Sequence, residues 1–479
     1  MQQQFKLLIN GEWVAGKAVS ANINPSDTSD VIGEYAQADE NLTLHAIDAA
    51  KTAFKSWSVS SIQQRFDLLD TVGTEILARK DELSTLLALE EGKTKAEALG
   101  EVTRAGQIFK FFAGECVRLT GDKLASIRPG IEIEITREPI GVVGLITPWN
   151  FPIAIPAWKI APALAYGNTV VFKPAELVPG SAWALADIIH RAGAPAGVFN
   201  LVTGRGSVVG ETLVNHPDVA AISFTGSENT GRNIAAKVVG RMAKVQLEMG
   251  GKNPLVVLDD ADLEIAAEVA VNGAFYATGQ RCTASSRFIV TSGIHDRFVD
   301  AVMAKMRKLQ VGHALAADTL IGPVVDKNQL DIDCHYIQLG QQEGAKLAFG
   351  GEVLQRKTQG FFLQPALFTE TKVDMRIAKE EIFGPVACVL KVADYEEALT
   401  MANETKFGLS SGIVTTSLKY ANHYKRHAKS GMVMINAPTA GVDYHVPFGG
   451  SKGSSYGARE QGRYAAEFYT TVKTAYIAS

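Results

Sequence analysis

The chain has 479 residues, 46% hydrophobic and 20% charged, with a formal net charge of -4. A chain of this length is too long for a single hydrophobic core, so we expect a soluble globular protein with two or three domains. The charge offers no basic patch for nucleic acid, and prolines and a lysine interrupt the apolar stretch 153–165, so we expect neither a nucleic-acid nor a membrane partner.

The N-terminal part is predicted to begin with a hairpin and to continue with helices. The apolar runs 6–9 and 13–15 flank Asn10-Gly11, which is a strong hairpin signal. Residues 131–135 alternate between isoleucine and glutamate, which predicts a half-exposed strand that extends a sheet or meets another subunit. Between these segments the periodicity is helical, with scaffold helices expected over 41–56, 62–79, 81–92 and 96–119.

From residue 142 strands and helices alternate. Strands are predicted over 142–147, 169–173, 198–202, 220–226 and 244–249, with helices over 153–167, 179–192, 207–216 and 229–239. This alternation predicts a parallel sheet with helices on both faces, in which ligands bind at the carboxyl ends of the strands. Five residues follow or end these strands: Asn150, Lys173, Gly204, Gly226 and Glu248.

The usual dinucleotide-binding motif is absent from this unit. Residues 204–210 have one residue too many for Gly-x-Gly-x-x-Gly, and residues 226–231 lack the Lys-Ser/Thr of a P-loop. On motif grounds alone, nucleotide binding stays undecided.

A second alternating unit follows Asn253, with strands expected over 254–258 and 287–290 and helices over 262–276 and 295–309. Gly279 is expected to end the first of these helices, which places Cys282 at a helix-to-strand junction. The adjacent Arg281 could favour a thiolate, so Cys282 is the candidate nucleophile.

The remaining cysteines, Cys116, Cys334 and Cys388, lie in segments with helix or strand periodicity, where a buried structural role is the usual one. The four cysteines form neither a disulfide framework nor a Cys-x-x-Cys metal site, which is typical of a reducing compartment. Residues 1–4 lead into a strand without the features of a signal peptide. We expect a cytoplasmic protein without a metal site.

Six motifs occur in order along the chain: Ile146–Pro152 (ITPWNFP), Phe224–Ser227 (FTGS), Leu247–Pro254 (LEMGGKNP), Gly279–Cys282 (GQRC), Glu381–Pro385 (EIFGP) and Pro447–Lys452 (PFGG-x-K). Together they resemble the signature set of the NAD(P)-dependent aldehyde dehydrogenase superfamily. The resemblance implies an α/β fold with a Rossmann-like cofactor domain, an α/β catalytic domain and a small β oligomerisation element. The expected ranges are 1–118 and 140–251 for NAD(P) binding, 252–451 for catalysis, and 119–139 and 452–479 for oligomerisation.

The tail 466–479 is rich in β-forming residues. In the family, such a tail pairs with the strand near 131–136 of a neighbouring subunit. The resemblance therefore implies a homodimer or a homotetramer.

Three residues match the family's catalytic positions. Cys282 would attack an aldehyde, giving a hemithioacetal that loses hydride to the cofactor and becomes a thioester. Asn150 resembles the oxyanion-hole amide, with the backbone N–H of Cys282 as a second donor, and Glu248 resembles the base that activates water. From the residues alone, Asn150 could instead be a turn residue and Glu248 an ion-pair partner of Lys252.

The resemblance implies NAD or NADP as cofactor, with the pyrophosphate near the helix that begins at Glu228 or Asn229. Lys173 and Glu176 look like the pair that holds the adenosine ribose, and a carboxylate there disfavours a 2'-phosphate, so NAD is slightly favoured. Glu381 and Phe383 resemble the residues at the nicotinamide ribose and ring, with a loop carboxylate and a core aromatic as alternatives. The full expected set is Ile146, Thr147, Pro148, Trp149, Lys173, Ala175, Glu176, Gly206, Gly210, Phe224, Thr225, Gly226, Ser227, Glu248, Met249, Gly250, Glu381 and Phe383.

The segment 436–462 most resembles that of members that oxidise α-ketoglutaric semialdehyde (2,5-dioxovalerate) to 2-oxoglutarate, so an anionic aldehyde is the expected substrate. Arg281 would suit its carboxylate, although surface exposure is an alternative for this residue. The expected substrate residues are Phe151, Trp158, Arg281, Thr283 and Phe448.

Other activities stay open as alternatives. Succinate or glutarate semialdehyde, or a broad range of aldehydes, could be the substrate. The arginines common in succinate-semialdehyde dehydrogenases are replaced here by Trp158 and Tyr276. A cysteine hydrolase would normally pair its cysteine with a histidine, and none of the nine histidines lies in the motifs. A noncatalytic relative would have no use for Asn150, Glu248 and Cys282 together.

Overall fold

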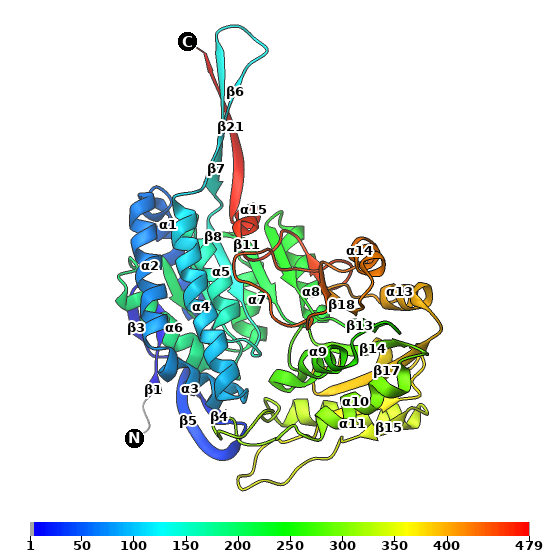
Figure 1. Cartoon of the computed structure of the whole chain (residues 1–479). Helices are drawn as coiled ribbons and strands as arrows, with labels where there is room; N and C mark the ends of the chain where they lie inside the picture. The colour runs from blue at the N-terminus through cyan, green and yellow to red at the C-terminus, as the bar shows by residue number, and fades with distance from the viewer. Residues whose placement is uncertain (1–3, 479) are drawn as a thin grey trace.

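The computed structural model describes residues 4–478, which form two large sheets and two small ones (Figure 1). The prediction for residues 1–4 therefore falls largely outside the described residues. Within 4–478, no helix is long and apolar enough to cross a membrane. The four cysteines are all free thiols.

The predicted parallel sheet is confirmed and is the core of an eight-stranded sheet. Its order is β20 (Ser455–Tyr456), β12 (Lys244–Glu248), β11 (Val219–Thr225), β8 (Val142–Ile146), β9 (Thr169–Lys173), β10 (Phe199–Leu201), β2 (Leu7–Ile9) and β3 (Glu12–Val14). The chain moves outward in one direction from β8 to β10 and in the other through β11 and β12. The switch between β8 and β11 is where such sheets bind ligands.

Alternate residues of these strands pack against helices on opposite faces. Val143 and Leu145 of β8 pack into a core with α2 (Ile62–Ala78), α4 (Lys95–Cys116), α5 (Ala154–Ala165) and α6 (Pro179–Arg191). Val142 and Ile146 pack into the other core with α1 (Glu40–Trp57), α7 (Glu211–Asn215) and α8 (Glu228–Gly240). Together with α3 (Lys80–Glu91), these helices confirm the helical periodicity seen in the sequence, although α4 ends at Cys116 rather than at 119.

The second unit is a seven-stranded sheet, parallel except for β15 at its edge. Its order is β15 (Lys346–Phe349), β16 (Ala366–Thr369), β17 (Val386–Val392), β14 (Ser285–Thr291), β13 (Asn253–Val257), β18 (Ser410–Val414) and β19 (Met432–Ile435). One face packs against α9 (Leu263–Phe275) and α10 (His295–Met306). The other packs against α11 (Lys327–Gln342), α12 (Arg376–Lys379), α13 (Tyr395–Asn403) and α14 (Leu418–His427).

Two small sheets complete the fold. One joins β1 (Gln4–Phe5), β5 (Asp27–Gln37) and β4 (Ala18–Asn24). The other is a ribbon of β6 (Asp122–Ala125), β7 (Ile131–Pro139) and β21 (Thr470–Ala478) that projects from the body of the molecule (Figure 1).

The expected pairing of the tail with a neighbouring subunit is wrong for this strand, because β21 pairs antiparallel with β7 of its own chain from Thr470↔Pro139 to Ala478↔Ile131. The short helix α15 (Ala466–Tyr469) brings the tail to this position, where the Asn168 side chain donates a hydrogen bond to the carbonyl of Tyr469.

Candidate functional site

The predicted motifs meet between the two large sheets. The strands β8, β9, β11 and β12 of the eight-stranded sheet end in this region. On the other side, β13 and β14 of the seven-stranded sheet begin there, with Cys282 three residues before β14. The only residues between Glu248 at the end of β12 and Asn253 at the start of β13 are 249–252, so one short connection joins the two sheet edges.

Cys282 lies on a tightly held loop. Helix α9 ends at Phe275, earlier than Gly279, and a distorted 3-10 turn (Tyr276–Gly279) follows in which Ala277 and Thr278 have φ values of 51° and 56°. Gly279 is needed inside this turn, since a Cβ there would lie 2.3 Å from the carbonyl oxygen of Gly384. The Asn253 side chain donates hydrogen bonds to the carbonyls of Cys282 and Ala284 at 2.8 and 3.0 Å, which fixes the loop to β13.

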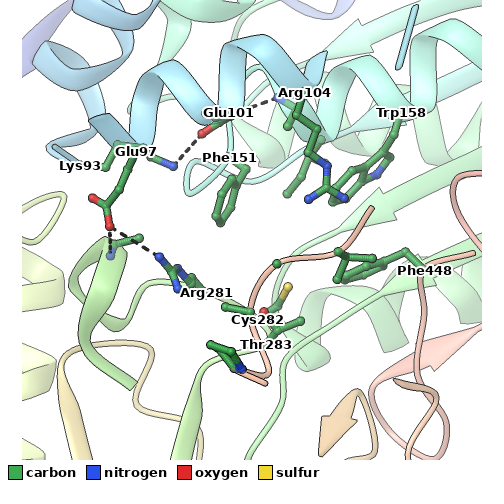
Figure 2. Close-up of a pocket in the computed structure, with 18 of the residues that line it drawn as sticks. Lys93, Glu97, Glu101, Arg104, Phe151, Trp158, Arg281, Cys282, Thr283 and Phe448 are labelled. Carbon is green, nitrogen blue, oxygen red and sulfur yellow. Dashed lines mark hydrogen bonds and ion pairs between the residues drawn. The ribbon is translucent and has the colours of Figure 1, made fainter. Parts of the chain in front are cut away.

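A cavity of about 460 Å³ opens at Cys282 (Figure 2). All five predicted substrate residues lie in its wall, namely Phe151, Trp158, Arg281, Thr283 and Phe448. The rings of Trp158 and Phe448 are stacked with centroids 5.3 Å apart. The cavity therefore combines a thiol with a largely aromatic wall.

Burial and nearby carboxylates disfavour the thiolate of Cys282. Burial, followed by the charges of Glu248 and Glu381, raises the pKa of Cys282 to about 12. The Arg281 guanidinium donates to the carbonyl of Asn272 at 3.3 Å and to Glu97 at 3.5 Å, and its favouring of a thiolate at Cys282 stays a prediction.

Glu248 is 2% exposed at the end of β12. Its Oε2 accepts a hydrogen bond from the Ser455 hydroxyl at 2.5 Å, while its Oε1 has no partner among residues 4–478. Burial and the neighbouring Glu460 hold the pKa of Glu248 well above its usual range. The alternative ion pair with Lys252 does not form, since the Lys252 ammonium has no hydrogen-bond partner in the described chain.

Asn150 is buried directly behind the cysteine loop. Its side-chain amide donates to the carbonyl of Gln280, two residues before Cys282, at 3.0 Å. The backbone carbonyl of Asn150 accepts a hydrogen bond from the Lys93 ammonium at 2.6 Å. These bonds fix an amide donor beside the nucleophile loop.

Sequence reasoning missed the charged helix face opposite the cysteine. Lys93 precedes α4 and pairs with Glu101 at 2.7 Å, and Arg104 follows one turn later on the same face. Three cavity residues of α4, Glu97, Glu101 and Arg104, are spaced by three or four positions, so helical periodicity could have grouped them. The sequence did not indicate that this face of α4 lies against the cavity at Cys282.

The predicted cofactor residues lie along the carboxyl edge of the eight-stranded sheet. Lys173 is 5% exposed and its ammonium donates to the carbonyl of Pro174, while the exposed Glu176 accepts from the backbone N–H of Gly206 at 3.2 Å. A Cβ on Gly206 would meet nothing within 4 Å, and the buried Thr225 hydroxyl has no partner within 4–478. A lysine and a carboxylate near the end of β9, with an orphaned hydroxyl two strands away at the end of β11, fit the ribose and phosphates of a dinucleotide.

Ser227 caps the helix that follows β11, where its hydroxyl accepts from the Thr230 N–H. The N-terminus of this helix, α8, carries the partial positive charge that favours phosphate. Gly210 ends the π-helical turn η1 (Gly206–Gly210), at which a Cβ would lie 3.9 Å from Lys173. The other predicted residues of this edge are Ile146, Thr147, Pro148, Ala175, Phe224, Gly226 and Met249, all at or just beyond strand ends.

The second cofactor group comes from the other sheet. Trp149 packs edge-on against Phe383, with centroids 5.5 Å apart and Phe383 at φ 67°. Glu381 accepts from the Gly251 N–H at 2.8 Å, and a Cβ on Gly250 would lie 1.9 Å from its carboxylate oxygen. Only a glycine at position 250 leaves room for Glu381. Burial raises the pKa of Glu381 to about 7.

Comparison with known proteins matches residues 13–475 to the aldehyde dehydrogenase family. The chain is 44% identical to the alpha-ketoglutaric semialdehyde dehydrogenase of Bacillus subtilis, covering 99% of this chain and 98% of that protein. It is 41% identical to the 2,5-dioxopentanoate dehydrogenase of Saccharolobus solfataricus, covering 97% and 98%. Its fold is similar to that of a betaine aldehyde dehydrogenase of Staphylococcus aureus in complex with NAD+, with a TM-score of 0.96, 34% identity, and coverage of 99% and 94%.

Proposed function

The chain belongs to the aldehyde dehydrogenase family, and we propose that it oxidises 2,5-dioxovalerate to 2-oxoglutarate with NAD. The family activity, aldehyde oxidation to the acid with NAD(P), follows from the full-length match. The substrate is proposed from the relatives named for this aldehyde and from the charge of the cavity. The observation that carries the proposal is the cavity itself, in which a cysteine faces an aromatic wall and a surplus cation.

Cys282 is proposed as the nucleophile. Its sulfur would bond to the aldehyde carbon once the thiol proton is lost, and the carbonyl oxygen would become an oxyanion. Loss of hydride from that carbon leaves a thioester on Cys282. Bound NAD(P) would supply the hydride acceptor.

Asn150 and the backbone N–H of Cys282 are proposed as donors to this oxyanion. The bond from Asn150 to Gln280 supports this role, because one amide hydrogen anchors the side chain and leaves the other available. A preorganised donor of this kind lowers a barrier by roughly 2–4 kcal/mol.

Glu248 is proposed as the base that takes a proton from water during thioester hydrolysis. Its Oε1 has no partner among the described residues and could accept that proton, while Ser455 holds Oε2. Burial raises the pKa of Glu248, which makes its carboxylate a stronger base than an exposed one.

The cofactor residues along both sheet edges keep their proposed roles. Lys173 and Glu176 would hold the adenosine ribose, and Glu176 supports NAD over NADP because a carboxylate repels a 2'-phosphate. Glu381 and Phe383 would hold the nicotinamide ribose and ring. Residues 1–118 and 140–251 would form the cofactor domain and 252–451 the catalytic domain.

We also propose that the protein forms a homodimer or homotetramer through residues 119–139 and 452–479. The support is the ribbon of β6, β7 and β21, whose apolar Val472, Tyr476 and Ile477 are exposed. A cytoplasmic location is proposed from the four free thiols.

Steady-state turnover tests the proposed function. Formation of NADH or NADPH is measured with 2,5-dioxovalerate, succinate semialdehyde, glutarate semialdehyde, propanal and benzaldehyde. We expect the highest kcat/KM for 2,5-dioxovalerate with NAD. A higher kcat/KM for benzaldehyde or propanal would contradict the substrate.

A further inference from the structure

We propose that Arg104, and not Arg281, binds the distal carboxylate of the substrate and gives the enzyme its preference for carboxylated aldehydes. This inference rests on the proposed function, since it deepens the assignment of an anionic substrate. Arg104 is on α4, and Figure 2 shows its side chain beside Trp158, while Arg281 points towards Glu97 on the other side of Phe151.

The charges of the cavity wall do not balance. The wall contains three cationic residues, Lys93, Arg104 and Arg281, and two carboxylates, Glu97 and Glu101. Lys93 pairs with Glu101 and also lies 3.8 Å from Glu91, which does not line the cavity, while Arg281 pairs with Glu97. Both carboxylates of the wall therefore already have a cationic partner. Arg104 is left with no ion pair within 4 Å among residues 4–478.

The two carboxylates are also held in place by backbone groups. Glu101 accepts from the N–H groups of Ile153 and Ala154 at 3.0 and 3.1 Å. Glu97 accepts from the N–H of Ala277 at 2.6 Å and closes the capping box of α4 with Thr94. Neither can turn to neutralise Arg104 without losing these bonds.

Some hydrogen-bond donors of Arg104 have no partner within residues 4–478. One guanidinium nitrogen donates to the Gln461 side chain at 3.0 Å, while its buried Nε has no partner in the described chain. The guanidinium carbon lies 5.6 Å from the centre of the Trp158 ring, whose own Nε1 is also buried without a partner. A planar guanidinium with free N–H groups beside a second free N–H donor fits a carboxylate with a neighbouring keto oxygen.

The space for the ligand lies on the same helix face. Gly100 is one turn before Arg104 and lines the cavity, and a Cβ there would meet nothing within 4 Å. The substrate chain could therefore extend along α4 from the thiol of Cys282 to Arg104. Glu101 and the exposed Asp443 are the acidic groups that act on Arg104.

The test compares Arg104→Gln with the matched variant Arg281→Gln. For each enzyme, kcat/KM is measured with 2,5-dioxovalerate, glutarate semialdehyde and pentanal, a neutral aldehyde with five carbons. For Arg104→Gln we expect a loss of about 10- to 100-fold with both carboxylated substrates, mainly in KM, and less than about threefold with pentanal. Arg281→Gln should affect the charged and neutral substrates alike.

Two further measurements separate binding from a structural role. Arg104→Lys should recover part of the preference for carboxylated aldehydes, since it keeps the charge but not the planar fork. Glutarate should inhibit pentanal oxidation competitively in the wild type and more weakly in Arg104→Gln.

Equal losses of all three substrates in Arg104→Gln, or a loss confined to carboxylated substrates in Arg281→Gln, would overturn the inference. A wild-type enzyme that oxidises glutarate semialdehyde no better than pentanal would overturn it as well. If the wild type fails only with 2,5-dioxovalerate, the proposed substrate is wrong, and the glutarate semialdehyde data still decide the role of Arg104. Absence of NADH formation with every aldehyde would reject the proposed function.

Discussion

The carboxyl edge of the eight-stranded sheet and the amino edge of the seven-stranded sheet contribute to the site in different ways. The first presents side chains directly from strand ends, as with Lys173 and Glu248. The second presents Cys282 on a loop that precedes its strand and is tied down by Asn253. The sheet itself positions a side chain at a strand end. The position of Cys282 depends instead on side-chain hydrogen bonds to its loop and on residues in left-handed conformations.

Under the proposed roles, the first edge supplies the base and most of the cofactor contacts, and the second supplies the nucleophile together with Glu381 and Phe383. Variants on each edge should therefore affect separate steps.

Cys282→Ala should lower aldehyde oxidation by at least about a thousandfold, because Cys282 is the one thiol among the described residues that line the cavity. NADH binding, measured by fluorescence titration, should change by less than about twofold, because Cys282 is not among the residues proposed to hold the cofactor. Residual oxidation near the wild-type rate would remove Cys282 from its role, and a large loss of NADH affinity would break the separation of the two edges.

Glu248→Gln should still produce a burst of NADH equal to one turnover and then slow by roughly 10²- to 10⁴-fold, because only hydrolysis needs a base. Rapid mixing with absorbance detection measures both phases. Since the pKa of Glu248 is raised, the basic form appears as the pH rises, so wild-type turnover should increase with pH through the raised pKa. The variant should lack this increase, and wild-type steady turnover would contradict the proposed base.

Asp333→Asn should have the smallest effect, and we expect that effect on thermal stability and not on turnover. Asp333 is fully buried on α11, with one oxygen bonded to Gln329 at 2.9 Å and the other without a partner within 4–478. Burial raises its pKa from 3.8 to about 8. The folded state therefore favours the protonated form, and the wild type loses stability as the pH rises from about 4 to about 8.

The Tm advantage of Asp333→Asn should thus grow by a few degrees between pH 5 and pH 8, as measured by calorimetry. Turnover at pH 7 serves as the control, since Asp333 does not line the cavity. A Tm difference that is the same at every pH would show that its carboxyl does not titrate in this range.

The sequence predicted the first sheet edge better than the second. The strands and helices of 142–249 have clear periodicity, so their order and the positions of Lys173 and Glu248 follow from the pattern. The turn before Cys282 could not be predicted, because Ala277 and Thr278 adopt left-handed conformations that their residue types disfavour. Motif resemblance located Cys282 without describing its surroundings.

The wall of the cavity at Cys282 was only partly predicted, for a similar reason. Its five predicted residues lie near motifs, whereas Arg104 belongs to a helix assigned to the scaffold. Helical periodicity groups Arg104 with Glu97 and Glu101 but cannot tell which charge is already neutralised. That distinction depends on tertiary contacts such as the pair of Arg281 with Glu97.

The projecting ribbon has a consequence for biosynthesis. Arg137 of β7 bonds to Thr470 at the start of β21, a residue 333 positions later in the chain. A ribosome therefore makes almost the whole protein before β7 can acquire this partner. Until then the hairpin of β6 and β7 exposes an unpaired edge, so the ribbon should be among the last parts to form and a site at which nascent chains associate wrongly or bind chaperones.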